Sequence, residues 1–431
     1  MEKTLFIIAS FILVSLGVYD VLTLNAYATD VPFWDTWDLL PMGSYGHLFD
    51  FYNENMQFFY FLISEIIYRV ADWNLRYFIA VNFLVYLSVI LIYGIILNKT
   101  RQDKKIAFYP LFLCILLTPM LGYNWLWVFL VQTHTFILFF LLAIYFGFTK
   151  QDKVYSAYAC GVCLFLSVIS MNIPLAVGGT IAYIIKEAVN GKTNGWNKCI
   201  KNCAALLCTL GLLMACLMLM TDISNFVNVR MSHTALSWDY LKNLSFYLIN
   251  SLSVFAFADV INWQIALPWA CLHFSLLFIA FCEQYDKKRL QSLWGLTFGI
   301  LFCMCGIIAF RGGEVYSYDY TFIRHNETAF MMLPAVMMIF FLSKYKLIRG
   351  YAIIILGLSL CGIAADMRAQ RFQFFGNLFY KNGCLCLNHY YNLKTIKDWQ
   401  CTMNFPIPRP DAMEKGQKMN LSFIKTISDC Y

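Results

Sequence analysis

Long apolar runs separated by short polar stretches form the dominant pattern along the chain. A helix needs about 20 apolar residues to cross the hydrocarbon core of a bilayer, so each long run predicts a membrane-spanning helix. The pattern therefore predicts an all-α polytopic membrane protein with about eleven spans. We place these spans at residues 4–25, 76–97, 107–121, 127–148, 154–170, 173–186, 203–221, 264–282, 290–310, 328–342 and 351–365.

Two further segments are amphipathic rather than uniformly apolar. Residues 53–70 alternate apolar and polar groups at helical spacing, which predicts a helix lying along the membrane interface. Glu54 and Glu65 stand about three turns apart in that segment and would share one face of the helix. Residues 238–258 predict a second interfacial or re-entrant helix. The alternative, a full crossing, would invert the orientation of every later span.

Composition indicates that lipid is the main solvent of this chain. Of its 431 residues, 60% are hydrophobic and 13% are charged, whereas a soluble domain averages roughly one half and one quarter. The aromatic share is 18%, and Trp and Tyr favour the membrane interface. The formal net charge is +7, but the basic residues sit in short loops rather than on one face. That distribution argues against a nucleic-acid partner.

Lys and Arg are distributed unevenly between alternate loops. If the N-terminus is cytoplasmic, the cytoplasmic loops hold 17 of the 32 basic residues, and the outer loops before the last span hold six. The positive-inside rule therefore predicts an N-terminus inside and, with an odd number of spans, a C-terminus outside. The resulting organisation is a transmembrane helical domain, 1–365, with outer loops 26–75, 222–263 and 311–327, and a small outer region, 366–431.

The stretch VPFWDTWDLL begins the first outer loop and contains Asp35 and Asp38. One interpretation is structural: Asp caps helix N-termini, and the Trp residues belong to an interfacial aromatic belt. The other is catalytic, because two carboxylates three residues apart share a helical face, and apolar surroundings raise a carboxyl pKa. A carboxylate tuned in this way suits a general base for a hydroxyl group. We favour the catalytic interpretation, with Asp35 ahead of Asp38.

Two arginines stand out in the otherwise basic-poor outer loops. Arg311 and Arg324 bracket residues 312–323, and His325 follows directly. Arginine presents a planar fork of donors that matches phosphate oxygens, so we expect these residues to contact a phosphate, with His325 assisting. The alternative is that both arginines form salt bridges with acidic residues of the same loop.

Two isolated polar residues are further candidates for substrate contact. Gln132 lies inside an apolar span, where polar side chains face the bundle interior and either line a cavity or join neighbouring helices. Glu54, in FYNENMQ, is a second candidate. No HExxH or CxxC pattern occurs, and the six histidines are scattered, so the sequence predicts no metal site of that type. A divalent ion held by Asp35 and Asp38 is the remaining metal alternative.

Four of the sixteen cysteines lie in the outer region, at positions 384, 386, 401 and 430. The others fall almost entirely within spans, where a thiol behaves as a small apolar group. An oxidising exterior favours a disulfide in the outer region. Our preferred pair is Cys386 with Cys401, and the alternative is that all four thiols are free.

Taken together, these segments resemble the GT-C superfamily of membrane glycosyltransferases. VPFWDTWDLL resembles the aspartate-bearing first loop of a bacterial subgroup, and NWLWVFLVQTHTF resembles its Trp-x-Phe-x-x-Gln segment. SYDYTFIRH is similar to its late Arg/Tyr loop, and CLNHYYNLKTIKDWQC to its Cys-Leu-x-x-Tyr tail with a second Cys. The subgroup's His-Asn-Glu-His-Arg stretch is represented here by YNENM, which keeps only Asn53 and Glu54.

The resemblance implies a reaction, a donor and a location. The reaction would be transfer of a sugar, a hexose such as glucose, from a polyprenyl-phosphate carrier to a hydroxyl of a surface polysaccharide or lipid-linked glycan, as in O-antigen modification of lipopolysaccharide. The catalytic Asp would be Asp35 or Asp38, acting with inversion and no cofactor, and Arg311 and Arg324 would hold the carrier phosphate. The enzyme would sit in a bacterial inner membrane with its site on the periplasmic face. The alternatives are a flippase for a lipid-linked glycan and an O-antigen-type polymerase.

Overall fold

A computed structural model describes most of the chain, and the described part is almost entirely helical. This confirms the helical class expected from the apolar runs. The only strands among the described residues are β1 (Phe51–Tyr52) and β2 (Asn55–Met56), which pair antiparallel. The described residues are 2–32, 34–52, 55–100, 106–149, 154–170, 173–221, 263–285, 287–311, 330–393 and 410–425.

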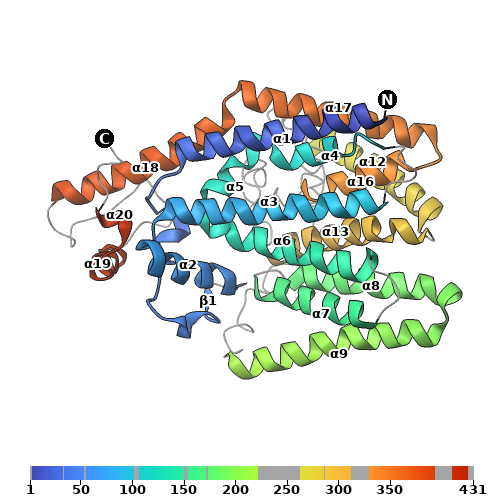
Figure 1. Ribbon diagram of the computed structural model, residues 1–431, viewed down its shortest axis with the longest axis horizontal. Coiled ribbons are helices and arrows are strands. Elements are labelled where there is room, and N and C mark those ends of the chain that lie inside the picture. The colour runs from blue at the N-terminus through green and yellow to red at the C-terminus, as the bar shows by residue number, and fades with distance from the viewer. Residues whose placement is uncertain are drawn as a thin grey trace.

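Five helical stretches are long and apolar enough to cross a membrane, which indicates a membrane protein. Each coincides with an expected span, and the helices run side by side along the long axis of the molecule (Figure 1). The five are α1 (Glu2–Tyr27), α3 (Leu75–Thr100), the continuous stretch Val128–Thr149 containing α6 (Val131–Ile144), α9 (Trp196–Met220) and α17 (Lys346–Arg368).

The other expected spans also contain helices, but with different bounds. The run at 173–186 is the start of a longer helix, which reaches Asn194, and the run at 328–342 contains a helix of nine residues. That short helix is the centre of the core, and Leu333 to Phe340 are all buried. The helices concerned are α7 (Val154–Ile169), α8 (Ile173–Asn194), α12 (Trp263–Gln284), α13 (Gln291–Arg311) and α16 (Leu333–Phe341).

The expected span at 107–121 is not one continuous helix, because this part of the chain consists of short helical pieces. The backbone becomes extended at Thr118 and again at Trp127, and Pro119 cannot donate a backbone hydrogen bond. Irregular backbone at membrane depth requires shielding from lipid, and both break residues are buried. The pieces are α4 (Pro110–Cys114), η3 (Ile115–Leu117), η4 (Pro119–Leu121), α5 (Gly122–Leu126) and η5 (Val128–Leu130).

The expected interfacial helix at 53–70 is shorter than the sequence suggested. Helix α2 begins at Phe58 and ends at Ala71, and the two short strands precede it. The expectation that Glu54 and Glu65 share a helical face is therefore wrong, because residues 55–57 are not helical. The second amphipathic segment, 238–258, lies outside the described residues.

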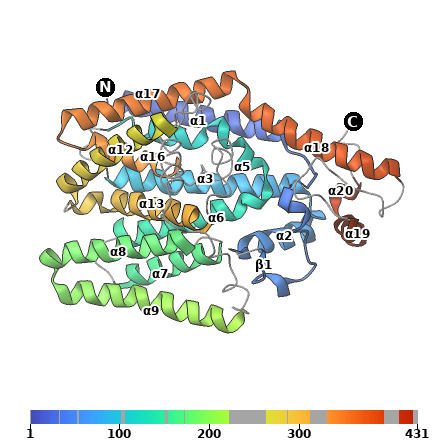
Figure 2. The ribbon, with the colours of Figure 1, turned by 180° about the vertical axis from the view of Figure 1, so that it is seen from behind.

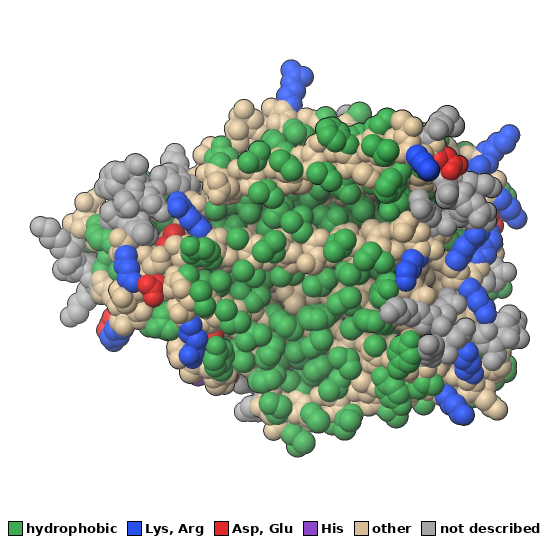
Figure 3. Space-filling model, in the orientation of Figure 1, with side chains coloured by type: hydrophobic (Ala, Val, Ile, Leu, Met, Phe, Trp, Pro, Cys, Tyr) green, Lys and Arg blue, Asp and Glu red, His purple; other side chains and the backbone are tan. Residues whose placement is uncertain are grey.

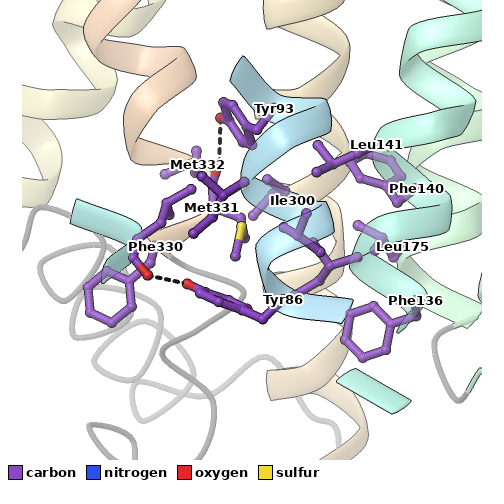
Figure 4. Packing of buried hydrophobic residues seen from close by; sticks show 14 of the residues in the cluster. Tyr86, Tyr93, Phe136, Phe140, Leu141, Leu175, Ile300, Phe330, Met331 and Met332 are labelled. Carbon is purple, nitrogen blue, oxygen red and sulfur yellow. Dashed lines mark hydrogen bonds between the residues drawn. The ribbon is translucent and has the colours of Figure 1, made fainter. Parts of the chain in front are cut away.

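The core joins α3, α6, α8, α13 and the segment around α16 (Figure 4). Tyr93 of α3 is fully buried, and its hydroxyl donates to the carbonyl oxygen of Met331 at 2.6 Å and accepts from the backbone N–H of Ala335 at 3.0 Å. These two bonds satisfy a carbonyl oxygen and an N–H group at the start of α16, where backbone groups lack partners within the helix and Pro334 has no N–H to donate. One tyrosine therefore joins the short central helix to α3.

The two ends of the helix bundle differ in charge. At the basic end, where α1 begins, Lys and Arg side chains gather (Figure 3). At the opposite end, the segment between α1 and α3 packs with the C-terminal helices, as both ribbon views show (Figures 1 and 2). We call this the capped end. Those helices are α18 (Arg371–Leu393), which follows α17 directly, α19 (Pro410–Lys418) and α20 (Ser422–Lys425).

Helices α6 and α13 approach closely because Gly299 has no side chain. A Cβ atom at this position would collide with the ring of Phe140, which is buried and cannot move aside freely. We expect Gly299→Ala to destabilise the protein by about 1–3 kcal/mol, because it overpacks this helix crossing.

The measurement is thermal unfolding of the purified protein in detergent. The matched control is Gly211→Ala in α9, where an added Cβ meets nothing within 4 Å. The control should be neutral or slightly stabilising, since Ala favours helix over Gly. Equal melting temperatures for the two variants would contradict the assigned packing.

Candidate functional site

Two of the sequence segments that carry the resemblance meet at the capped end. The 3₁₀ turn η1 (Trp34–Trp37) packs against η5, so the segment of Asp35 and Asp38 lies beside the segment of Trp127 and Phe129, which comes much later in the chain. Asp35 is in η1, and its side chain lies outside the described part. Asp38 follows the turn and is half-buried. The two acidic positions are therefore one within the turn and one directly after it.

The residues on either side of Asp38, Trp37 and Leu39, are held by contacts with other segments. Trp37 is buried with its ring edge against Phe423 of α20, at a centroid distance of 5.4 Å. The hydroxyl of Tyr60 in α2 donates to the carbonyl oxygen of Leu39 at 3.1 Å. The turn that carries the acidic positions is therefore held between α2, η5 and the C-terminal segment.

Glu65 has a structural role in the same loop. Its Oε1 atom accepts the backbone N–H groups of Met42 at 2.5 Å and Gly43 at 3.0 Å. From the other side, the Lys415 ammonium donates to the carbonyl oxygen of Leu40 at 3.4 Å. Burial lowers the pKa of Lys415, and the attraction of Glu65 partly offsets that effect. A carboxylate and an ammonium thus hold the loop from two sides.

Asp30 joins the first and last parts of the chain. Its Oδ1 atom accepts the backbone N–H of Leu75 at 2.7 Å, which caps α3, and its Oδ2 atom accepts the Ser422 hydroxyl at 2.5 Å. The ion pair between Lys425 and Asp72, at 2.8 Å, reinforces the same contact. Asp30 is buried, so these bonds are shielded from water.

Asn82 of α3 compensates for the helix break at Trp127. Its side-chain amide donates to the carbonyl oxygens of Asn124 at 3.1 Å and Trp125 at 3.0 Å, and its Oδ1 lies 2.5 Å from Nδ1 of His134. All of these groups are buried. Sequence reasoning missed Asn82, although an Asn inside an otherwise apolar span is itself a signal.

Gln132 is the second residue of α6 and is fully buried. Neither its amide nitrogen nor its amide oxygen has a hydrogen-bond partner. It lies two turns before Phe139 and so on the same face of α6, and the Phe139 ring is 5.1 Å from the ring of Phe59 in α2. Gln132 therefore lies on the face of α6 that packs against α2.

Arg311 is the last residue of α13, and only its backbone is described. Gly295 lies against Ile144 and Gly299 against Phe140, so α13 runs antiparallel to α6. Twelve residues beyond Gly299, or about 18 Å along the helix, the chain reaches Arg311. Twelve residues before Phe140, the chain is at Val128, the first residue of η5. Because the two helices are antiparallel, Arg311 at the end of α13 lies at about the same depth in the bundle as η5.

Several expected site residues cannot be placed. Glu54, Arg324, His325 and Cys401 lie outside the described residues. Cys386 of α18 is disulfide-bonded, and so is Cys384, for which the sequence suggested no pairing. The specific pair of Cys386 with Cys401 stays a prediction.

Within the described ranges, no three His, Cys, Asp or Glu side chains gather as metal ligands. Comparison with known proteins gives no family model, no curated protein and no solved structure that matches the chain.

Replacing Asp30 tests the link between the two ends of the chain. We expect Asp30→Ala to destabilise the protein by about 2–3 kcal/mol, because a buried backbone N–H and a buried hydroxyl lose a charged acceptor. Thermal unfolding provides the measurement. The control is Asp50→Ala in the same loop, where the carboxylate is exposed and contacts only His47 among the described residues. Similar melting temperatures for the two variants would show that the link contributes no stability.

Proposed function

We propose that the protein is a membrane glycosyltransferase. In this proposal it moves a hexose, such as glucose, from a polyprenyl-phosphate carrier to a hydroxyl of a surface polysaccharide or lipid-linked glycan. The observation that most supports it is the packing of η1 against η5, which brings the acidic turn beside the segment that leads into Gln132. A lone acidic turn at a membrane boundary would be an ordinary cap. An acidic turn beside a buried, unpartnered amide has the components of a polar substrate site.

The proposed orientation places the capped end outside the cell, at the periplasmic face of a bacterial inner membrane. The gathering of Lys and Arg at the opposite end supports this, because basic residues are retained on the cytoplasmic side (Figure 3). The proposed topology has eleven membrane spans, with the N-terminus inside the cell and the C-terminus outside. The donor's lipid tail would then lie in the bilayer and its sugar would reach the capped end.

The proposed reaction is an inverting displacement. Asp35, or Asp38 in its place, takes the proton of the acceptor hydroxyl, whose oxygen attacks the anomeric carbon from the side opposite the phosphate. The bond between that carbon and the phosphate oxygen breaks, and the carrier phosphate leaves with both bonding electrons. Arg311 and Arg324 stabilise the negative charge on the departing phosphate. No cofactor takes part in these steps.

A second candidate function is transport of a lipid-linked glycan. Asp20, inside α1, is fully buried, and neither carboxylate oxygen has a hydrogen-bond partner. Ionisable residues in membrane spans often mark ion or proton paths, which a coupled transporter needs and a glycosyltransferase does not. Sugar transfer by the purified protein would favour the enzyme, and the length of the glycan product would separate single transfer from polymerisation.

The assignment of the base is tested by Asp35→Asn and Asp38→Asn in liposomes that contain a polyprenyl-phosphate hexose and a glycan acceptor. Loss of the base should lower the transfer rate by about 10²–10⁴-fold in one of the variants. Asp50→Asn, an exposed carboxylate of the same loop, is the control and should retain activity. Full transfer by both test variants would remove these residues from the mechanism.

A further inference from the structure

Three buried, uncharged polar side chains near the acidic turn have unused hydrogen-bonding capacity. They are Thr36 in η1, Gln57 at the start of α2 and Gln132 at the start of α6. Each is at most 1% exposed. The unpartnered atoms are the Thr36 hydroxyl oxygen, the Gln57 amide oxygen, and both the oxygen and the nitrogen of the Gln132 amide.

All three residues are placed around η5. Thr36 belongs to the turn that packs on η5. Gln57 is one turn before Tyr60, whose ring lies 6.0 Å from the ring of Phe129 in η5. Gln132 follows η5 directly along the chain. One short turn thus joins three elements that each contribute an unpartnered polar group.

Some buried polar groups near these three residues do find partners within the chain. The Ser64 hydroxyl accepts the indole N–H of Trp73 at 2.8 Å, and the Asn82 amide is occupied by backbone carbonyl oxygens. Buried polar groups usually find partners, because leaving them unpaired costs stability. The indole N–H of Trp125, just before η5, is unpartnered as well. The unpaired groups thus gather around one turn, where they are available to pair with something other than the protein itself.

We propose that Thr36, Gln57 and Gln132 form a binding site for an uncharged, polyhydroxylated sugar ring. Sugar hydroxyls both donate and accept hydrogen bonds, which matches a set made of a hydroxyl, an amide oxygen and a whole amide. The aromatic rings of Trp127 and Phe129, stacked at 5.3 Å, provide an apolar surface in the same turn. The three side chains carry no charge with which to balance a uronic acid or an amino sugar.

The inference rests on the proposed function, because the acidic turn that would act on this sugar is the one that contains Thr36. It restricts the proposed hexose to uncharged sugars and adds two residues, Thr36 and Gln57, that the sequence did not suggest. It also predicts an unusual combination of effects. Apolar replacements should stabilise the empty protein and weaken sugar binding at the same time.

The first experiment uses Gln132→Leu and Thr36→Val, which keep the approximate side-chain volume. Without sugar, each variant should melt about 1–3 °C above wild type, since an unpaired polar group has been removed. In the transfer assay, the KM for the sugar substrate should rise about tenfold. Asn82→Leu is the matched control: its amide is fully used within the protein, so this variant should melt several degrees below wild type. Melting of Gln132→Leu below wild type would overturn the proposal and assign Gln132 a structural role.

The second experiment does not depend on catalysis. Protein purified in an amine-oxide detergent, so that no glycoside is present, is melted with methyl glucoside, glucosamine or glucuronate. We expect methyl glucoside alone to raise the melting temperature of wild type, and the rise to disappear in Gln132→Leu. No rise with any sugar, equal rises with all three, or a rise that survives in Gln132→Leu would overturn the site. Failure of transfer with a preserved methyl glucoside effect would instead count against the proposed reaction.

Discussion

The need to satisfy every backbone polar group away from water constrains this structure more than any other requirement. A protein in lipid can use irregular backbone only where its own side chains replace the missing hydrogen bonds. Asn82 does this at the Trp127 break, and the Tyr93 hydroxyl does it at the start of α16. Because these bonds hold, the chain can turn within the bundle and present η5 to the acidic turn. The candidate site therefore depends on an asparagine and a tyrosine that do not belong to it.

Buried polar residues in this protein fall into two physical groups. Asp30 and Asn82 have partners within the chain, and their removal is expected to weaken the fold. Thr36 and Gln132 have no such partners, so the fold does not gain from their polarity. The proposal that Thr36 and Gln132 bind a substrate, whereas Asp30 and Asn82 hold the fold, rests on this difference.

The sequence predicted the helical class and several spans because apolar run length depends only on the bilayer. It also identified VPFWDTWD and Gln132 as candidate positions. It did not predict the breaks at Thr118 and Trp127, since the side chains that make a break tolerable come from distant helices. Nor did it predict that Glu65 would bind the loop backbone, because a carboxylate on an amphipathic helix has the same local pattern whether it meets solvent or an N–H group. The sequence also did not predict that η1 packs against η5, because local patterns carry no information about contacts between distant segments.

The contact between Asp30 and Ser422 has a consequence for how the protein is made. The two residues are 392 positions apart, so at about 5–20 residues per second the ribosome needs about 20–80 s to produce the second after the first. Throughout that interval the first loop lacks the Ser422 hydroxyl and the Phe423 ring against which Trp37 packs. The acidic turn is consequently assembled last, although it is among the first segments synthesised. A nascent chain acquires its finished first loop only when its C-terminal segment arrives.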